Sequence, residues 1–100
     1  MELHELTRLI RSKNAGPFML TFDIIFADRE GYERVTAAGI VSPERISALY
    51  GVSQDKVAVY LCEAAHAIKI SFPRPVTSGD PDDPDVFGCQ QHAPLVHLAV

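Results

Sequence analysis

The sequence contains no tryptophan, only two cysteines, and no run of the roughly 18 apolar residues that a membrane helix requires. Cys62 and Cys89 lie far apart and form no Cys-x-x-Cys pair, so the sequence indicates neither a zinc knuckle nor a redox motif. We expect two free thiols, because disulfides are rare in a reducing compartment, and we expect Cys62 to lie in the core.

Basic charge is also scarce. The formal net charge of −4 argues against a nucleic-acid-binding protein, which normally has a basic face. The first five residues are acidic and lack the basic region and apolar core of a signal peptide, which predicts a cytoplasmic protein with no membrane segment. The acidic stretch 79–85 lacks the ligand spacing of a calcium loop, so we predict no metal and no cofactor.

The composition is that of an ordinary globular domain. Apolar residues make up 47% of the 100 residues and charged residues 22%. A chain of this size can bury one core but not two, so we predict a single domain over residues 1–100.

Strand patterns dominate the chain. From Phe18 to Phe26 apolar residues alternate with other residues, and the face that begins with Phe18 is predicted to dominate the core. Residues 3–11 fit a helix or a strand, and we favour a strand from Thr7 onward. Further strands are predicted in 57–62 and 67–72, and a last one is predicted in 96–100.

Two helices are predicted between these strands. Asp28 can cap a helix that ends at Gly39, and Ser42-Pro43 starts a second helix that stops at Gly51. The predicted fold is therefore an α+β domain. It has an antiparallel or mixed sheet of four or five strands with two short helices on one face.

A polar and basic turn at 11–17 is the first candidate site. Gly16-Pro17 breaks the chain there, between apolar runs on both sides. Two cations, a hydroxyl and an amide in one turn suit an anion such as a carboxylate, although a solvated loop is the alternative. The substrate-binding candidates are Arg11, Ser12, Lys13 and Asn14. Asp23 could be an exposed strand residue or a carboxylate near this site.

Two further segments contain candidate residues. Arg74 lies between two prolines, so its backbone has few alternatives and its guanidinium could be a fixed anion contact. Gln90, Gln91 and His92 form an unusual polar cluster, in which His92 could act as a general acid or base. The cluster could instead satisfy backbone groups at strand ends. We expect the loop, Arg74 and this cluster to converge at one end of the sheet.

Several motifs together carry a family resemblance. They are Arg-Ser-Lys-Asn-Ala-Gly-Pro-Phe (11–18), Leu-Thr-Phe-Asp-Ile-Ile-Phe (20–26), Ala-Ile-Lys-Ile (67–70), Pro-Arg-Pro (73–75) and Gln-Gln-His-Ala-Pro-Leu (90–95). Over nearly its whole length the chain resembles a small bacterial family of unknown function, DUF 4387. Members of that family commonly occur beside proteins resembling the acyclic terpene utilisation protein AtuA, which are linked with the breakdown of branched or CoA-activated acids. Some of these companions end in a ferredoxin-like domain, so the resemblance leaves a ferredoxin-like sandwich open.

The resemblance implies a small subunit of an AtuA-like catabolic complex. In our first hypothesis the protein is an accessory subunit that helps to bind an anionic substrate, a carboxylate or an acyl-CoA, next to a larger partner. In the second it is a small lyase or hydratase that uses His92. In the third it is a structural oligomerisation module without a ligand, which would assemble with copies of itself.

Overall fold

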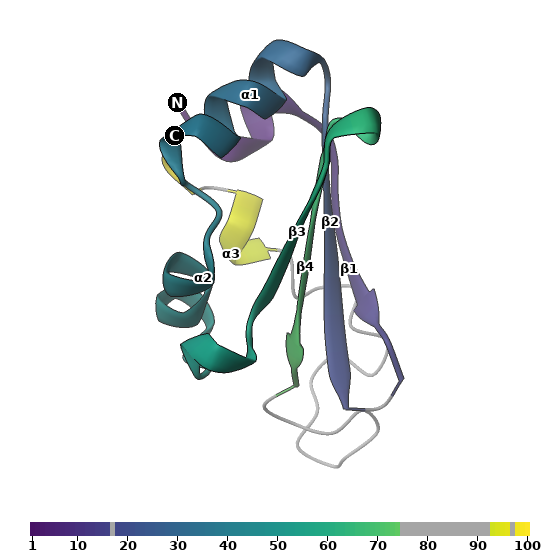
Figure 1. Cartoon of the computed structure of the whole chain (residues 1–100), viewed down its shortest axis with the longest axis vertical. Coiled ribbons are helices and arrows are strands. Elements are labelled where there is room, and N and C mark those ends of the chain that lie inside the picture. Colours follow the sequence, from purple (N-terminus) through teal and green to yellow (C-terminus); the bar gives the residue numbers. More distant parts are fainter. Residues whose placement is uncertain (17, 75–92, 97) are drawn as a thin grey trace.

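The computed structural model describes residues 1–16, 18–74, 93–96 and 98–100. Along the chain, one β-hairpin precedes the two long helices and a second β-hairpin follows them (Figure 1). The elements are β1 (Thr7–Asn14), β2 (Met19–Phe26), α1 (Arg29–Ala38), α2 (Pro43–Tyr50), β3 (Ala58–Cys62), β4 (Ala67–Pro73) and α3 (Ala93–Val96). Short 3₁₀ turns cover Leu3–Leu6, Gln54–Lys56 and Glu63–Ala65.

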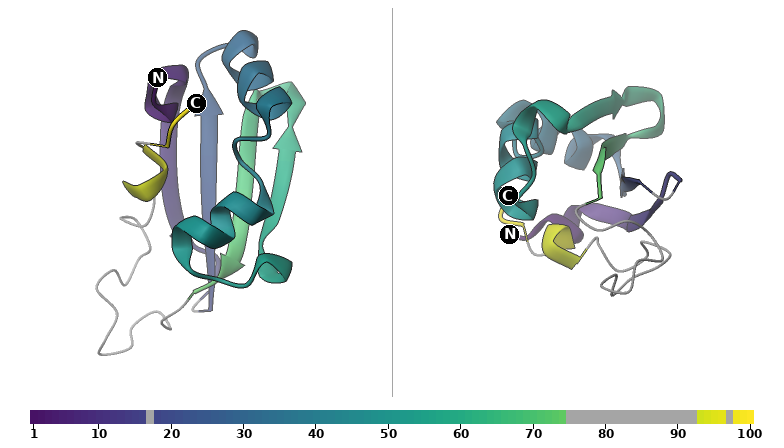
Figure 2. Two further views of the ribbon diagram at one scale, coloured as in Figure 1. Left: turned by 90° about the vertical axis from the view of Figure 1, so that its left-hand side faces the viewer. Right: turned by 90° about the horizontal axis from the view of Figure 1, so that it is seen from below.

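The four strands form one antiparallel sheet in the order β1-β2-β4-β3. Helices α1, α2 and α3 lie on the same side of this sheet, and no helix of the described residues lies on its other side (Figures 1 and 2). The prediction of an α+β domain with two short helices on one face of the sheet is confirmed. Of the predicted alternatives, four or five strands and an antiparallel or mixed sheet, the described residues form four strands, all antiparallel. From β1 to β4 the element order is ββααββ, which differs from the βαββαβ order of a ferredoxin-like sandwich. No helix among the described residues is long and apolar enough to cross a membrane.

Local sequence sets the ends of both long helices, as predicted. The side chain of Asp28 accepts a hydrogen bond from the backbone N–H of Gly31, and α1 stops at Gly39. Ser42 caps α2 in the same way, and α2 stops at Gly51. Gly39 and Gly51 both adopt left-handed backbone angles, with φ of 64° and 69°, which glycine adopts without steric cost.

The core lies between the helices and one face of the sheet. The inward residues of the two central strands, β2 and β4, are buried, and α1 and α2 supply Tyr32, Val35 and Ile46. The ring of Tyr50 packs on Phe22 and Phe72, with centroids 5.2 and 5.1 Å apart. The buried apolar residues of the central strands are Leu20, Phe22, Ile24, Phe26, Ile68, Ile70 and Phe72.

The C-terminus differs from the prediction of a last strand in 96–100. Residues 93–96 form the short helix α3, and among the described residues after it an isolated bridge joins Ala99 to Glu2. Backbone hydrogen bonds from Leu3 to Leu98 (2.8 Å) and from Val100 to Met1 (2.9 Å) hold the two ends of the chain side by side. The alternation was misleading because a few apolar residues at a chain end also suit a segment that packs across the core.

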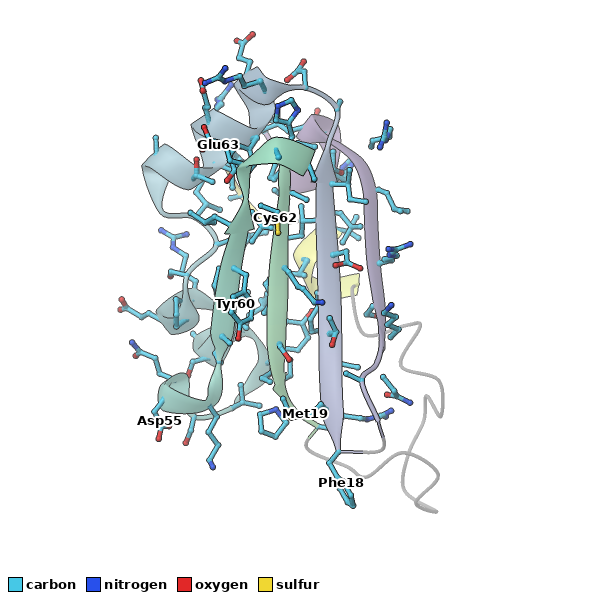
Figure 3. All side chains as sticks on the ribbon, turned by 45° about the vertical axis from the view of Figure 1, so that its right-hand side comes forward. Phe18, Met19, Asp55, Tyr60, Cys62 and Glu63 are labelled. Atoms are coloured by element: carbon cyan, nitrogen blue, oxygen red, sulfur yellow. The ribbon has the colours of Figure 1, made fainter. Side chains whose placement is uncertain are left out.

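Two further predictions are wrong in detail. Cys62 is exposed instead of buried, because it lies on the side of the sheet that no helix covers. Phe18 is 65% exposed instead of leading the core face, because it precedes the first residue of β2 and extends beyond the end of the sheet (Figure 3).

Candidate functional site

One end of the sheet brings together the β1–β2 turn and the end of β4. Asn14 is the last residue of β1, and Gly16 turns the chain with a φ of 80°. The backbone N–H of Ala15 donates to the carbonyl of Met19 at 2.9 Å. The backbone N–H of Arg74, just past β4, donates to the carbonyl of Phe18 at 2.8 Å. Segments about 60 residues apart in the sequence therefore meet at this end.

At this end of the sheet, the side chain of Arg74 contacts the side chain of Asn14. Its Nη1 donates a hydrogen bond to Asn14 Oδ1 at 2.5 Å, in a partly buried setting. Both residues fall on the helix side of the sheet, because side chains alternate along a strand and Phe72 and Ser12 lie on that side. A guanidinium has five N–H donors in a fixed plane, so it can hold Asn14 and contact further acceptors.

Ser12 belongs to the same side of β1. Its side chain lies opposite Phe22 in the sheet register, and only 5% of the residue is exposed. Among the described residues, no buried side-chain nitrogen or oxygen is without a hydrogen-bond partner. Ser12 is therefore a buried and satisfied hydroxyl beneath the Asn14–Arg74 pair.

Arg11 and Lys13 lie on the opposite side of the sheet, which corrects the picture of one polar loop at 11–17. Strand β1 continues to Asn14, so the predicted loop residues alternate between the two faces. Arg11 Nε donates to Asp23 Oδ2 at 3.0 Å, directly across the β1–β2 pair. Only Ser12 and Asn14 share a side with Arg74. Asp23 is thus the partner of Arg11 and has 21% of its side chain exposed.

The exposed ring of Phe18 was not predicted as part of a site. It lies at the turn, and its own carbonyl holds the backbone of Arg74 (Figure 3). The available signal was its position next to Gly16-Pro17, since a residue that close to a turn can lie outside the sheet. The apolar ring of Phe18 and the guanidinium of Arg74 therefore belong to two residues whose backbones are hydrogen-bonded to each other at this end of the sheet.

Gln90, Gln91 and His92 lie outside the described residues, as does Cys89. Their predicted convergence with Arg74, and the predicted role of His92 in proton transfer, stay predictions. The part of the chain that the structure describes holds no group of three or more histidine, cysteine, aspartate or glutamate residues that could hold a metal ion.

Three described side chains have displaced pKa values. Burial raises the pKa of the Tyr50 phenol. Burial, followed by the negative charge of Glu63, raises the pKa of Tyr32. A hydrogen bond to Glu33 raises the pKa of Arg29, which lies on the surface of α1. A raised pKa keeps each phenol in its neutral form up to a higher pH.

The chemistry of this end suits recognition of an anion. Arginine binds carboxylates and phosphates through paired N–H groups, and such charge-assisted hydrogen bonds are about twice as strong as neutral ones. The Asn14 contact fixes the plane of the guanidinium from one side. The described residues therefore place one guanidinium, held by Asn14, at the end of the sheet where Phe18 is exposed.

Comparison with known proteins places the chain in one family. A family model described as a domain of unknown function, DUF4387, matches residues 3–99. No curated protein and no solved structure matches the chain. Since the match covers nearly all of the sequence, it includes both hairpins, both long helices and the Asn14–Arg74 pair. The chain belongs to the DUF4387 family.

Proposed function

We propose that the protein is a small accessory subunit that binds an anionic ligand, a carboxylate or an acyl-CoA, beside a larger AtuA-like partner. The observation that carries the proposal is the hydrogen bond between Arg74 and Asn14. It fixes a cation at the end of the sheet, where the backbone of Arg74 is also held by Phe18. A fixed guanidinium loses little conformational freedom when an acidic group arrives.

The ring of Phe18 supports a ligand with an apolar part. It is 65% exposed, although a phenylalanine at the end of a strand could pack on the sheet. A short-chain carboxylic acid has an acidic head for Arg74 and an apolar body for Phe18. The same pair of features would suit the surface of a partner protein, so ligand and partner could meet at this end of the sheet.

Binding of simple acids tests the ligand half of the proposal. Butyrate and coenzyme A are titrated into the ¹⁵N-labelled protein, and amide chemical shifts are followed. We expect butyrate to shift the amides of Asn14, Phe18 and Arg74, and we expect Arg74→Gln to abolish these shifts. The matched control is Arg34→Gln, which removes an exposed arginine from α1. If neither acid moves the amides near Arg74, the site assignment is wrong.

Co-expression tests the partner half. The chain is produced with an AtuA-like protein, and the mixture is examined by size-exclusion chromatography with light scattering. We expect the two proteins to co-elute as a complex, and we expect the control variant Arg34→Gln to form the same complex. Separate elution at micromolar concentrations of both chains would overturn the accessory-subunit proposal but would leave the anion site to be judged by the titration.

A further inference from the structure

The side of the sheet that faces away from the helices carries an ordered pattern of side chains. We call it the open face. Among the described residues it consists of alternate positions on all four strands, and Figure 3 shows the side chains of Tyr60 and Cys62 standing on it. Tyr60 is 56% exposed and Leu9 is 41% exposed. The open-face residues are Leu9, Arg11, Lys13, Met19, Thr21, Asp23, Ile25, Ala58, Tyr60, Cys62, Ala67, Lys69, Ser71 and Pro73. Thr21, in the middle of the face, is only 4% exposed.

One row of side chains across the open face alternates in charge. The sheet register places Arg11 opposite Asp23, Asp23 opposite Lys69, and Lys69 opposite Tyr60. In the order β1-β2-β4-β3, the row therefore reads positive, negative, positive, aromatic. Arg11 and Asp23 form an ion pair within the protomer, with 54% and 21% of their side chains exposed.

The neighbouring row is apolar across the whole width of the sheet. Leu9 lies opposite Ile25, Ile25 opposite Ala67, and Ala67 opposite Cys62. A continuous apolar row beside a charged row gives a surface that can exclude water and also specify an orientation.

We propose that the open face binds a second copy of the chain. The two sheets pack face to face about a two-fold axis that runs parallel to the strands. This axis places β1 on β3 of the second copy and β2 on β4 of the second copy. Asp23 then faces Lys69 of the second copy, and Arg11 faces the ring of Tyr60. The apolar row meets the apolar row, with Leu9 on Cys62.

The charges select this axis over the other face-to-face arrangement. A two-fold axis perpendicular to the strands would place β1 on β1 and β2 on β2. With that axis over the charged row, Arg11, Asp23 and Lys69 would each face the same residue of the second copy, which is unfavourable. If the same axis were shifted along the strands, the charged row of one copy would face the apolar row of the other. The charged side chains would then be desolvated without an opposite charge to pair with, which is unfavourable.

The area of the face indicates a reversible dimer. Four strands about 4.8 Å apart and about seven residues long at 3.3 Å each give a face of roughly 19 by 23 Å. This footprint is smaller than the roughly 800 Å² per partner of a standard stable interface. We therefore expect a dimer that dissociates on dilution through the micromolar range.

The inference does not depend on the proposed anion site, although the parallel axis would set both Arg74 residues at the same end of the dimer.

Charge reversal followed by mixing is the direct test. Sedimentation equilibrium is measured for the unchanged chain, for Asp23→Lys, for Lys69→Asp, and for an equal mixture of the two variants. In each single variant like charges face each other, so we expect the dissociation constant to rise at least about tenfold. In the mixture the charges at positions 23 and 69 are opposite across the interface, so we expect dimers to return with one chain of each kind. Arg34→Glu reverses a charge on α1 and should leave the dimer unchanged.

The outcomes against the proposal are equally clear. A wild-type chain that stays monomeric up to millimolar concentration would overturn it and would assign the open face to a different protein. A dimer that neither variant weakens would place the contact elsewhere on the molecule. Circular dichroism of each variant separates lost folding from lost association.

Cross-linking tests the axis itself and does not depend on the charge variants. Packed sheets lie about 10 Å apart, a distance that a short bismaleimide can span between cysteines. In a Cys89→Ser background, Leu9→Cys should cross-link to Cys62 of the second copy. Removing the native thiol as well, with Cys62→Ser, should abolish the product. A cross-link that persists without Cys62 would mean that β1 lies on β1 and would overturn the parallel axis.

Discussion

The two sides of β2 show how one strand can carry two different tasks. Toward the helices, Leu20, Phe22 and Ile24 are at most 1% exposed. Toward the open face, Asp23 makes an ion pair with Arg11 and keeps part of its carboxylate in contact with solvent. Burial of apolar surface is the main source of folding free energy, whereas exposed ion pairs contribute little. The helix side should therefore determine stability, and the open face should determine association.

Truncation of one aromatic residue on each side gives the largest contrast. Phe22 is fully buried and contacts the rings of Tyr50 and Phe72, so we expect Phe22→Ala to lower the free energy of unfolding by about 3–5 kcal/mol. Tyr60→Ala removes a side chain of which most is exposed, and we expect a loss of less than about 1 kcal/mol. Urea unfolding of dilute protein measures both. Equal losses would mean that the open face is covered within the protomer.

Alkaline pH gives the second contrast. Burial raises the pKa of Tyr50 above its unfolded value of about 10, so the folded state retains a proton that the unfolded state loses. Stability from this group is complete below pH 10 and falls above it, by at most about 1.4 kcal/mol per pH unit for one proton. Tyr50→Phe should therefore flatten the decline of the unfolding free energy between pH 10 and 11.

Tyr60→Phe is the matched control for this pH experiment, because Tyr60 lies on the open face. Its removal should leave the alkaline decline as steep as in the unchanged chain. If Tyr60→Phe flattens the decline as much as Tyr50→Phe does, burial at the helix side is not the cause.

The sequence predicted the helix side well for physical reasons. Alternation in 18–26 and 67–72 reports which residues a half-buried strand turns inward, and Asp28 and Ser42 are local signals that do not depend on the rest of the fold. The open face was harder to predict. Cys62 looks apolar in the sequence, but in the part of the chain that the structure describes no helix lies over it.

The candidate site was predicted in part. Arg74 was predicted as a site residue because of its rigid backbone. Its contact with Asn14 could not be predicted, because the two residues are 60 positions apart in the sequence although they are neighbours in space. Arg11 and Lys13 were grouped with them because they are neighbours in the chain. The strand period of two separates them, and that separation follows only when β1 is known to reach Asn14.

Loss of a helix cap should have an intermediate effect. Asp28 accepts a hydrogen bond at 2.8 Å from the backbone N–H of Gly31, and α1 covers the inner face through Tyr32 and Val35. We expect Asp28→Ala to cost about 1 kcal/mol in unfolding free energy. Asp28→Asn should restore most of it, because the amide oxygen can accept the same hydrogen bond. If both variants lose the same amount, the cap does not stabilise the helix layer.

The ion pair of the open face should have the smallest effect on folding. Arg11 and Asp23 are directly opposite in the register, but half of the arginine side chain is exposed. A double-mutant cycle with Arg11→Ala and Asp23→Ala, measured below the concentration of self-association, should give a coupling free energy of about 0.2–1 kcal/mol. Added salt should reduce it further. A coupling of 2 kcal/mol or more, on the scale of a pair withdrawn from water, would contradict the division between the two faces. A small coupling together with a large effect of Asp23→Lys on the dimer would mean that the same carboxylate matters more between chains than within one.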